Sequence, residues 1–186
     1  MASTRELSAI SKKQMALREQ LWPKKSGYLW DRQAKTDSGY KHAGFTTIPK
    51  TMPIIQRIMD EMSNRYPLSS TYLTLWCSTW DNSFVTLSKS RQMAFAAGFG
   101  GQRGAQTWAD RMKRLQDLHF IDIKPGDLGP MTYAIIWNPH MIIQWHRAHK
   151  TPGLTEASYN ALVAWALDIG AKDMTAELPA EIVEAA

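Results

Sequence analysis

The chain has 186 residues, which is long enough for one domain with an extension and for a substantial buried core. Eight tryptophans and ten methionines supply bulky core side chains, and the single cysteine, Cys77, excludes an internal disulfide framework. No run approaches the roughly 18 apolar residues of a membrane span, and the N-terminus lacks the apolar centre of a signal peptide. The composition therefore predicts a folded, cytoplasmic protein with no membrane partner.

The net charge of +5 is unevenly distributed along the chain. Residues 1–50 hold ten Lys and Arg against four Asp and Glu, and residues 51–152 hold eleven against seven. Residues 153–186 reverse this balance, with one lysine against six acids. A basic front and middle with an acidic tail favours a polyanionic partner, while solubility alone is the simpler interpretation.

The chain is expected to contain four segments. Residues 1–46 are predicted to form a basic, partly helical arm that is rich in glycine, serine and charge. Residues 47–150 contain the clearest periodicities and are expected to form the folded domain. Residues 151–174 hold an amphipathic helix, and residues 175–186 an acidic tail.

The first helix of the domain is predicted within "TIPKTMPIIQRIMDEM", where apolar side chains recur at helical spacing. Thr51 is in position to cap it and Pro53 lies in its first turn. The residues of the apolar stripe are Ile54, Ile55, Ile58, Met59 and Met62.

A second helix is expected within residues 67–80, with Ser69 or Ser70 as its cap. Cys77 lies in an apolar run of this segment, which would keep its thiol unreactive. The motif "DNSFVTLS" that follows is typical of a turn and a short strand.

The stretch "KSRQMAFAAGF" predicts a third helix that ends at Gly98. Four glycines then occur within seven residues, and a fourth helix is expected to begin near Gln102. Its apolar face would consist of Ala105, Trp108, Met112 and Leu115. Its opposite face would consist of Arg103, Gln106, Asp110, Lys113 and Arg114, with Thr107 at the edge.

A β-hairpin is predicted next, because "HFIDIKPG" and "MTYAIIWNP" have strand character and flank a turn rich in Gly, Pro and Asp. Residues 139–150 then predict a helix, and "TEASYNALVAWALDIG" predicts a capped amphipathic one. The domain's own core or a twin helix in a homodimer could cover the stripe of this last helix. The stripe consists of Tyr159, Leu162, Val163, Ala166 and Leu167.

The order helix, strand, helix, turn, helix, strand, hairpin turn, strand is that of a winged helix. The phrase "WADRMKRLQDLHFIDIKPG" resembles the winged helix-turn-helix family of DNA-binding proteins over roughly residues 67–137. The sequence on either side of this segment weakly resembles that of plasmid and phage regulators and replication initiators. The resemblance implies a mainly α fold with a small β-hairpin wing and with N- and C-terminal helical extensions. The family's seam between reading helix and hairpin is matched by Arg114, Leu115, Leu118, Phe120 and Ile121.

The resemblance implies double-stranded DNA as the partner. Arginine can pair bidentately with guanine and glutamine with adenine, and Arg103 and Gln106 lie near the start of the fourth helix. Lys89 and Arg91 would hold the DNA backbone, and Lys124 would reach DNA from the wing. The expected nucleic-acid-binding residues are Lys89, Arg91, Gln102, Arg103, Gln106, Thr107, Lys113, Arg114 and Lys124.

The sequence offers little support for dinucleotide binding, zinc binding or catalysis. The glycine motif "GFGGQRG" lacks the preceding strand and the downstream acid of a dinucleotide site. His140, His146 and His149 lack a further ligand in a position to complete a zinc site. No nucleophile–base pattern or paired carboxylates are recognisable, so we expect neither catalysis nor a cofactor.

The partners beyond DNA are less sharply defined. Winged helices also dock on proteins, so an adaptor within a larger nucleoprotein complex is the alternative to a DNA-binding regulator, transcription factor or replication accessory factor. A homodimer through residues 140–169 is favoured, because two copies on a palindromic site raise specificity. The arm at residues 1–46 would either follow the DNA or hold a protein partner.

Overall fold

The computed structural model describes residues 46–64, 66–79 and 83–176, together with the exposed helical residues Lys12, Lys13, Ala16, Leu17 and Gln20. The chain divides into two compact units, Met1–Phe45 and Thr46–Ala186. Most of the predicted arm and all but the first two residues of the predicted acidic tail lie outside the described residues.

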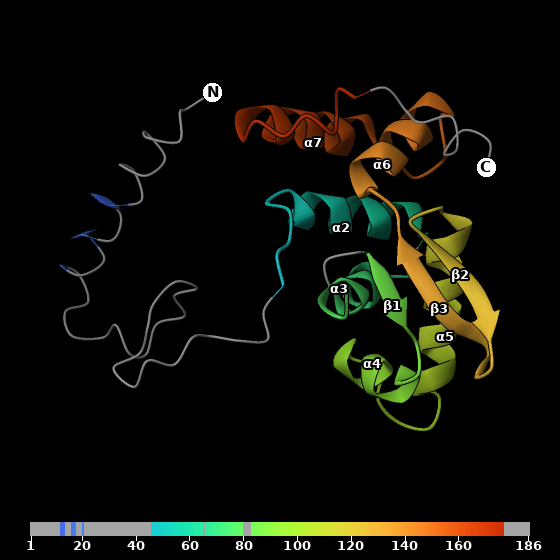
Figure 1. Ribbon diagram of the computed structural model, residues 1–186. Helices are drawn as coiled ribbons and strands as arrows, with labels where there is room; N and C mark the ends of the chain where they lie inside the picture. Colours follow the sequence, from blue (N-terminus) through green and yellow to red (C-terminus); the bar gives the residue numbers. More distant parts are fainter. Residues whose placement is uncertain are drawn as a thin grey trace. The chain divides into compact units, whose positions relative to one another are not determined.

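The second unit is mainly helical and contains one small antiparallel sheet, as predicted (Figure 1). The strand order β1-β3-β2 places the second strand of the hairpin in the middle of the sheet. In Figure 1, α6 and α7 lie above α2, and α4 lies at the opposite end, with α3 and the sheet between them. The elements are α2 (Met52–Met62), α3 (Ser69–Cys77), β1 (Phe84–Thr86), α4 (Ser90–Ala96), α5 (Gly104–Asp117), β2 (Ile121–Gly126), β3 (Gly129–Ile136), α6 (Pro139–Ala148) and α7 (Glu156–Asp168).

The caps predicted for the first two helices of this unit are wrong. Thr51 is the N-cap residue of α2, but its side chain makes no capping hydrogen bond. Neither Ser69 nor Ser70 caps α3, whose N-cap residue is Leu68. The carboxylate of Asp60 on α2 instead accepts hydrogen bonds from the backbone N–H groups of Leu68 at 2.5 Å and Ser69 at 2.9 Å. The cap of α3 therefore comes from another helix and joins the two together.

One-sided burial of α3 explains the position of the cysteine. Thr71, Tyr72 and Leu75 are its buried residues. Cys77 lies on the opposite side of the helix and is exposed, in contrast to its predicted burial in an apolar run. None of the described helices is both long enough and apolar enough to cross a membrane.

Backbone geometry accounts for the glycine cluster between α4 and α5. Gly98 and Gly101 have φ values of +90° and +77°, where a side chain would be strained. Gly104 opens α5 so close to the carbonyl group of Phe99 that an added Cβ would overlap it. Consequently α5 begins at Gly104, two residues later than the predicted start near Gln102.

One face of α5 closes the core. Trp108, Met112 and Leu115 are buried, as predicted. Ala105 was predicted on the same face but is exposed, because Gly104 occupies the buried position of the first turn.

The predicted hairpin consists of β2 and β3, joined by a two-residue turn. On β2, Ile121 and Ile123 are buried, whereas the alternate residues Asp122 and Lys124 are half-buried and exposed. Ala134, the partner of Ile123 on β3, is also buried. This alternation packs one face of the sheet on the core and leaves the other outward.

The last described helix, α7, is capped as predicted. The hydroxyl oxygen of Thr155 accepts a hydrogen bond from the N–H of Ser158 at 3.2 Å. Ser158, Leu162 and Ala166 are buried where α7 packs on α2, but Leu167 is 58% exposed. The domain's own core thus covers the centre of the stripe and leaves Leu167 outside it. A dimer through residues 140–169 would have to use exposed side chains such as Leu167.

Two substitutions in α7 separate core from surface. Leu162→Ala should lower the free energy of unfolding by about 2–5 kcal/mol, because it removes a fully buried side chain. Leu167→Ala should change it by no more than about 0.5 kcal/mol. Urea denaturation followed by circular dichroism measures both values, and equal losses would contradict this packing.

Candidate nucleic-acid interface

The predicted contact residues are mostly exposed. Thr107 is half-buried at the edge of α5, as predicted, and Arg114 is also half-buried. The exposed members of the set are Lys89, Arg91, Gln102, Arg103, Gln106, Lys113 and Lys124.

The segment that forms α4, the glycine turn and the first turn of α5 contributes cations but no carboxylate of its own. No Asp or Glu occurs between residues 83 and 109. Lys89 is the N-cap residue of α4, and Arg91 lies in the first turn of that helix. Arg103 is the N-cap residue of α5. Three exposed cations therefore surround the N-terminal ends of two consecutive helices, where the backbone N–H groups also favour anions.

The outward face of α5 combines amide and carboxylate groups. The side-chain amide of Gln106 donates a hydrogen bond to Oδ1 of Asp110 at 2.9 Å, and both side chains are exposed. Gln102 precedes the helix and lies in the turn rather than in the first helical turn. The polar groups available for base contacts on α5 itself are therefore those of Gln106, Asp110 and Lys113.

Two predicted contact residues are engaged within the chain. The guanidinium group of Arg114 donates a hydrogen bond to the carbonyl oxygen of Met62 at 3.3 Å, so it ties α5 to the C-terminal end of α2. The amine of Lys124 lies 3.0 Å from a carboxylate oxygen of Asp122, its neighbour on the outward face of β2. Helical and strand spacing placed both residues outward but did not indicate these partners.

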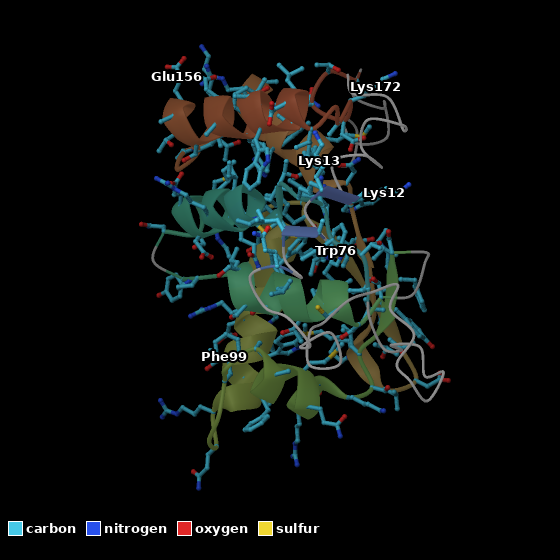
Figure 2. All side chains as sticks on the ribbon, turned by 90° about the vertical axis from the view of Figure 1, so that its left-hand side faces the viewer. Lys12, Lys13, Trp76, Phe99, Glu156 and Lys172 are labelled. Atoms are coloured by element: carbon cyan, nitrogen blue, oxygen red, sulfur yellow. The ribbon has the colours of Figure 1, made fainter. Side chains whose placement is uncertain are left out.

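Arg111 was not among the predicted contact residues. Its guanidinium carbon lies 4.9 Å from the ring centroid of Tyr66 and 5.9 Å from that of Phe99, which is labelled in Figure 2. Its Nε atom is buried and has no hydrogen-bond partner in the described part of the chain. Periodicity could not have found this cluster, because Tyr66 precedes α3 and Phe99 lies in the glycine turn.

A buried histidine fixes the C-terminal end of α5. Nε2 of His146 lies 2.9 Å from the carbonyl oxygen of Leu118, and Nδ1 lies 2.9 Å from the hydroxyl oxygen of Thr151. A carbonyl oxygen can only accept, so Nε2 carries the proton and Nδ1 accepts from Thr151. Burial lowers the pKa of His146 to about 4, opposed by the Leu118 carbonyl and reinforced by His119 and His149. The ring is therefore neutral at pH 7.

The histidines considered as zinc ligands are each occupied by packing. Nδ1 of His149 lies 2.9 Å from the carbonyl oxygen of Trp145, and the two rings stack with centroids 4.1 Å apart. Within the described ranges, no group of three or more His, Cys, Asp and Glu side chains is arranged to hold a metal ion.

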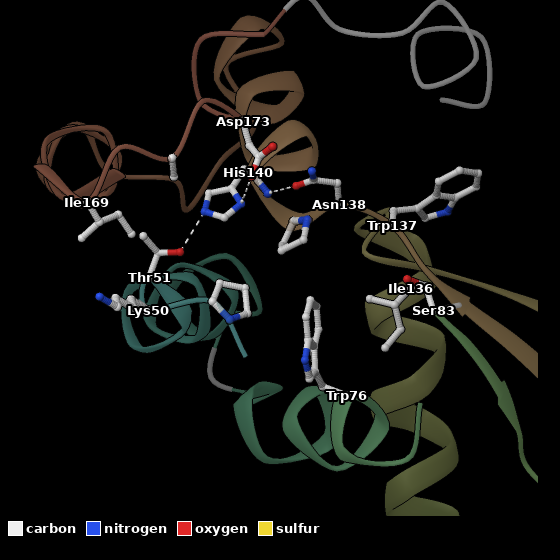
Figure 3. Close-up of a pocket in the computed structure, with 13 residues that line it drawn as sticks. Lys50, Thr51, Trp76, Ser83, Ile136, Trp137, Asn138, His140, Ile169 and Asp173 are labelled. Atoms are coloured by element: carbon white, nitrogen blue, oxygen red, sulfur yellow. Dashed lines mark hydrogen bonds and ion pairs between the residues drawn. The ribbon is translucent and has the colours of Figure 1, made fainter. Parts of the chain in front are cut away.

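Figure 3 shows a cavity of about 370 Å³. Its walls are formed by the N-terminal end of α2, the N-terminal end of α6, the helix α3 and the turn after α7. Trp76 rises from α3 toward the cavity, and His140 and Thr51 lie on another wall. Nε2 of His140 is 2.8 Å from the Thr51 hydroxyl oxygen, and Nδ1 is 3.7 Å from a carboxylate oxygen of Asp173. Burial lowers the pKa of His140, although Asp173 opposes this shift. These polar groups join α2, α6 and the final turn to one another.

The state of His146 predicts how stability depends on pH. Its pKa in the folded chain, about 4, is below its ordinary value of 6.5, so the unfolded chain takes up a proton first as pH falls. Stability should therefore be lost between pH 6.5 and 4, by about 3 kcal/mol from this residue. Denaturation at several pH values should show a weaker pH dependence in His146→Gln.

His149→Gln is the matched control, because this neighbouring histidine is exposed. It should reduce the pH dependence of the parent chain only slightly, because His149 makes the smallest of the contributions that lower the pKa of His146. Part of that dependence will persist in His146→Gln, since the pKa of His140 is also lowered. A His146→Gln variant with the full dependence of the parent would show that another group is responsible.

Comparison of the chain with protein-family models, curated proteins and solved structures found no match. What the chain binds must therefore be argued from its own side chains. The most informative of them are the exposed basic and amide groups of α4, the glycine turn and α5.

Proposed function

We propose that this chain is a DNA-binding protein of the winged-helix type that acts without catalysis. The order α3, β1, α4, α5, β2, β3 with the strand order β1-β3-β2 supports this arrangement. In it, α5 is the reading helix and the hairpin of β2 and β3 is the wing. The role we favour is that of a regulator or of an accessory factor in the replication of a mobile element.

The observation that carries this proposal is the set of exposed cations between residues 83 and 109, a segment that contains no Asp or Glu and is adjoined by one carboxylate, that of Asp110. A DNA duplex carries one negative charge per roughly 1.7 Å of its axis, so a carboxylate at the contact opposes binding. Lys89, Arg91 and Arg103 are exposed on this surface, around the starts of α4 and α5. A single α-helix fits the major groove, about 12 Å wide, with its N-terminal residues at the base edges.

Base reading would fall to the first two turns of α5. The exposed hydrogen bond between Gln106 and Asp110 contributes only about 0.5–1.5 kcal/mol, so DNA can replace it. Gln106 can then bond adenine, and the carboxylate of Asp110 can accept a hydrogen bond from the amino group of cytosine. Asp110 would in this way contribute to specificity even though its charge opposes the backbone.

The wing favours a second candidate function, that of an adaptor that docks on a protein. Its two-residue turn, Asp127 and Leu128, carries no cation, and Leu128 is 70% exposed. Lys124 is already paired with Asp122. A tip of this kind is poorly suited to phosphate and better suited to an apolar pocket on another protein.

Titration against pooled duplex DNA at about 50 and 200 mM salt tests the proposal. Arg103→Ala and Gln106→Ala should each weaken binding to the selected site by about 1–3 kcal/mol, because each removes a bidentate base contact. Binding to unrelated duplex should change much less in Gln106→Ala. A folded chain that binds no duplex at the lower salt would point to the adaptor instead.

Lys113→Ala provides a contrasting variant on the same helix. It removes an exposed charge and should lower affinity for all sequences alike, with a salt slope smaller by about 1. Lys124→Ala should have a smaller effect, since Asp122 already neutralises that amine. If Gln106→Ala and Lys113→Ala behaved identically on selected and unrelated duplexes, the reading face would lie elsewhere.

A further inference from the structure

Arg111 is positioned unlike the other cations of α5. The rings of Tyr66 and Phe99 lie 4.9 and 5.9 Å from its guanidinium carbon. Tyr66 is 58% exposed, so the cluster opens to solvent on that side. Both contacts are cation–π interactions with the faces of the rings, and they use none of the N–H donors of the guanidinium group.

The charge of Arg111 has no partner within the described part of the chain. It makes no ion pair there, and its Nε atom is buried without a hydrogen bond. Because no hydrogen-bond acceptor or carboxylate among the described residues engages the guanidinium group, its terminal N–H groups can give a bound anion charge-assisted hydrogen bonds without breaking an internal one. Its neighbours show that partners are within reach of this helix: Arg114 bonds a backbone carbonyl, and Asp110 bonds Gln106.

Arg111 also lies where a DNA backbone would pass. It is four residues after Thr107, so both side chains lie on the same flank of α5, and helical spacing places Arg111 between Thr107 and the buried face. In the proposed complex the outward face of α5, which carries Gln106 and Asp110, enters the groove, and the flanks of the helix approach the phosphates at the groove's edge. Phe99 belongs to the carboxylate-free turn that precedes the helix.

We propose that Arg111, held between Tyr66 and Phe99, is a clamp for a backbone phosphate of the bound DNA. The in-plane donors of the guanidinium group match two oxygens of one phosphate, whereas an ammonium group on a flexible stem would act only as a point charge. This inference rests on the proposed DNA-binding function and names one anchor that fixes how α5 lies along the duplex.

The test measures the affinity for one duplex as a function of salt, with the fold of each variant checked by its melting temperature. Arg111→Ala should weaken binding about tenfold and reduce the slope of log K against log salt by about 0.9. Arg111→Lys keeps the charge and should retain the slope, but should still lose affinity several-fold. Tyr66→Leu should also retain the slope and lose affinity several-fold, because it removes the ring that orients the guanidinium group.

Arg57→Ala is the matched control. Arg57 is an exposed arginine on α2 that is paired with Glu61 at 2.8 Å, and its removal should leave affinity and slope unchanged. If the parent chain bound duplex and both Arg111→Ala and Arg111→Lys bound it equally well, the clamp alone would be overturned. A lower melting temperature with unchanged affinity of the folded variants would also overturn it, since Arg111 would then act only in packing. A parent chain that bound no duplex would overturn the proposed function together with the clamp.

Discussion

The fixed placement of α5 is the constraint on which the rest of the second unit depends. Its buried face supplies Trp108, Met112 and Leu115 to the core, and its C-terminal end is bonded to other elements. The neutral ring of His146 bonds the carbonyl group of Leu118, and Arg114 reaches the carbonyl group of Met62. Because α6, its following loop and α2 all hold this end, the opposite end of α5 projects from a rigid support. Rigid support of this kind is what a helix needs if its first turns are to meet a partner in one register.

The outline of the fold could be predicted from the sequence because burial follows periodicity. The stripe of α5 and the alternation in β2 each bury apolar side chains on one side, and such patterns can be recognised locally. The cap of α7 was also predictable, because it lies within its own local sequence, but that of α3 was not, since it comes from Asp60, a residue of the preceding helix. The start of α5 was also missed, because the close approach of Gly104 to Phe99 depends on the backbone angles of the glycine turn, which residue types alone do not give.

The candidate site was predictable to a similar extent and for the same reason. Helical geometry correctly placed Arg103, Gln106 and Lys113 outward. It could not indicate whether a charge already has a partner, and this property separates Arg114 from Arg111. Arg114 finds a backbone carbonyl within the chain, whereas Arg111 finds two aromatic rings and, among the described residues, no acceptor. Two cations on one helix can therefore differ in whether they are available to a ligand, although helical spacing alone does not distinguish them.

This difference in availability bears on how affinity and specificity would be divided in the proposed complex. On the wing Lys124 is paired with Asp122 and Asp127 adds an acid at the tip, so the wing can add little electrostatic attraction to DNA. The uncompensated cations lie instead around α4 and α5, on the same helices that would approach the bases. Gln106 and Asp110 face outward between them and can discriminate among bases, but an Asp there weakens every backbone contact nearby. A phosphate anchor on the flank of α5 would offset that repulsion without occupying the reading face. Reading and anchoring would then be carried by adjacent faces of one helix, which makes the orientation of α5 the determinant of both.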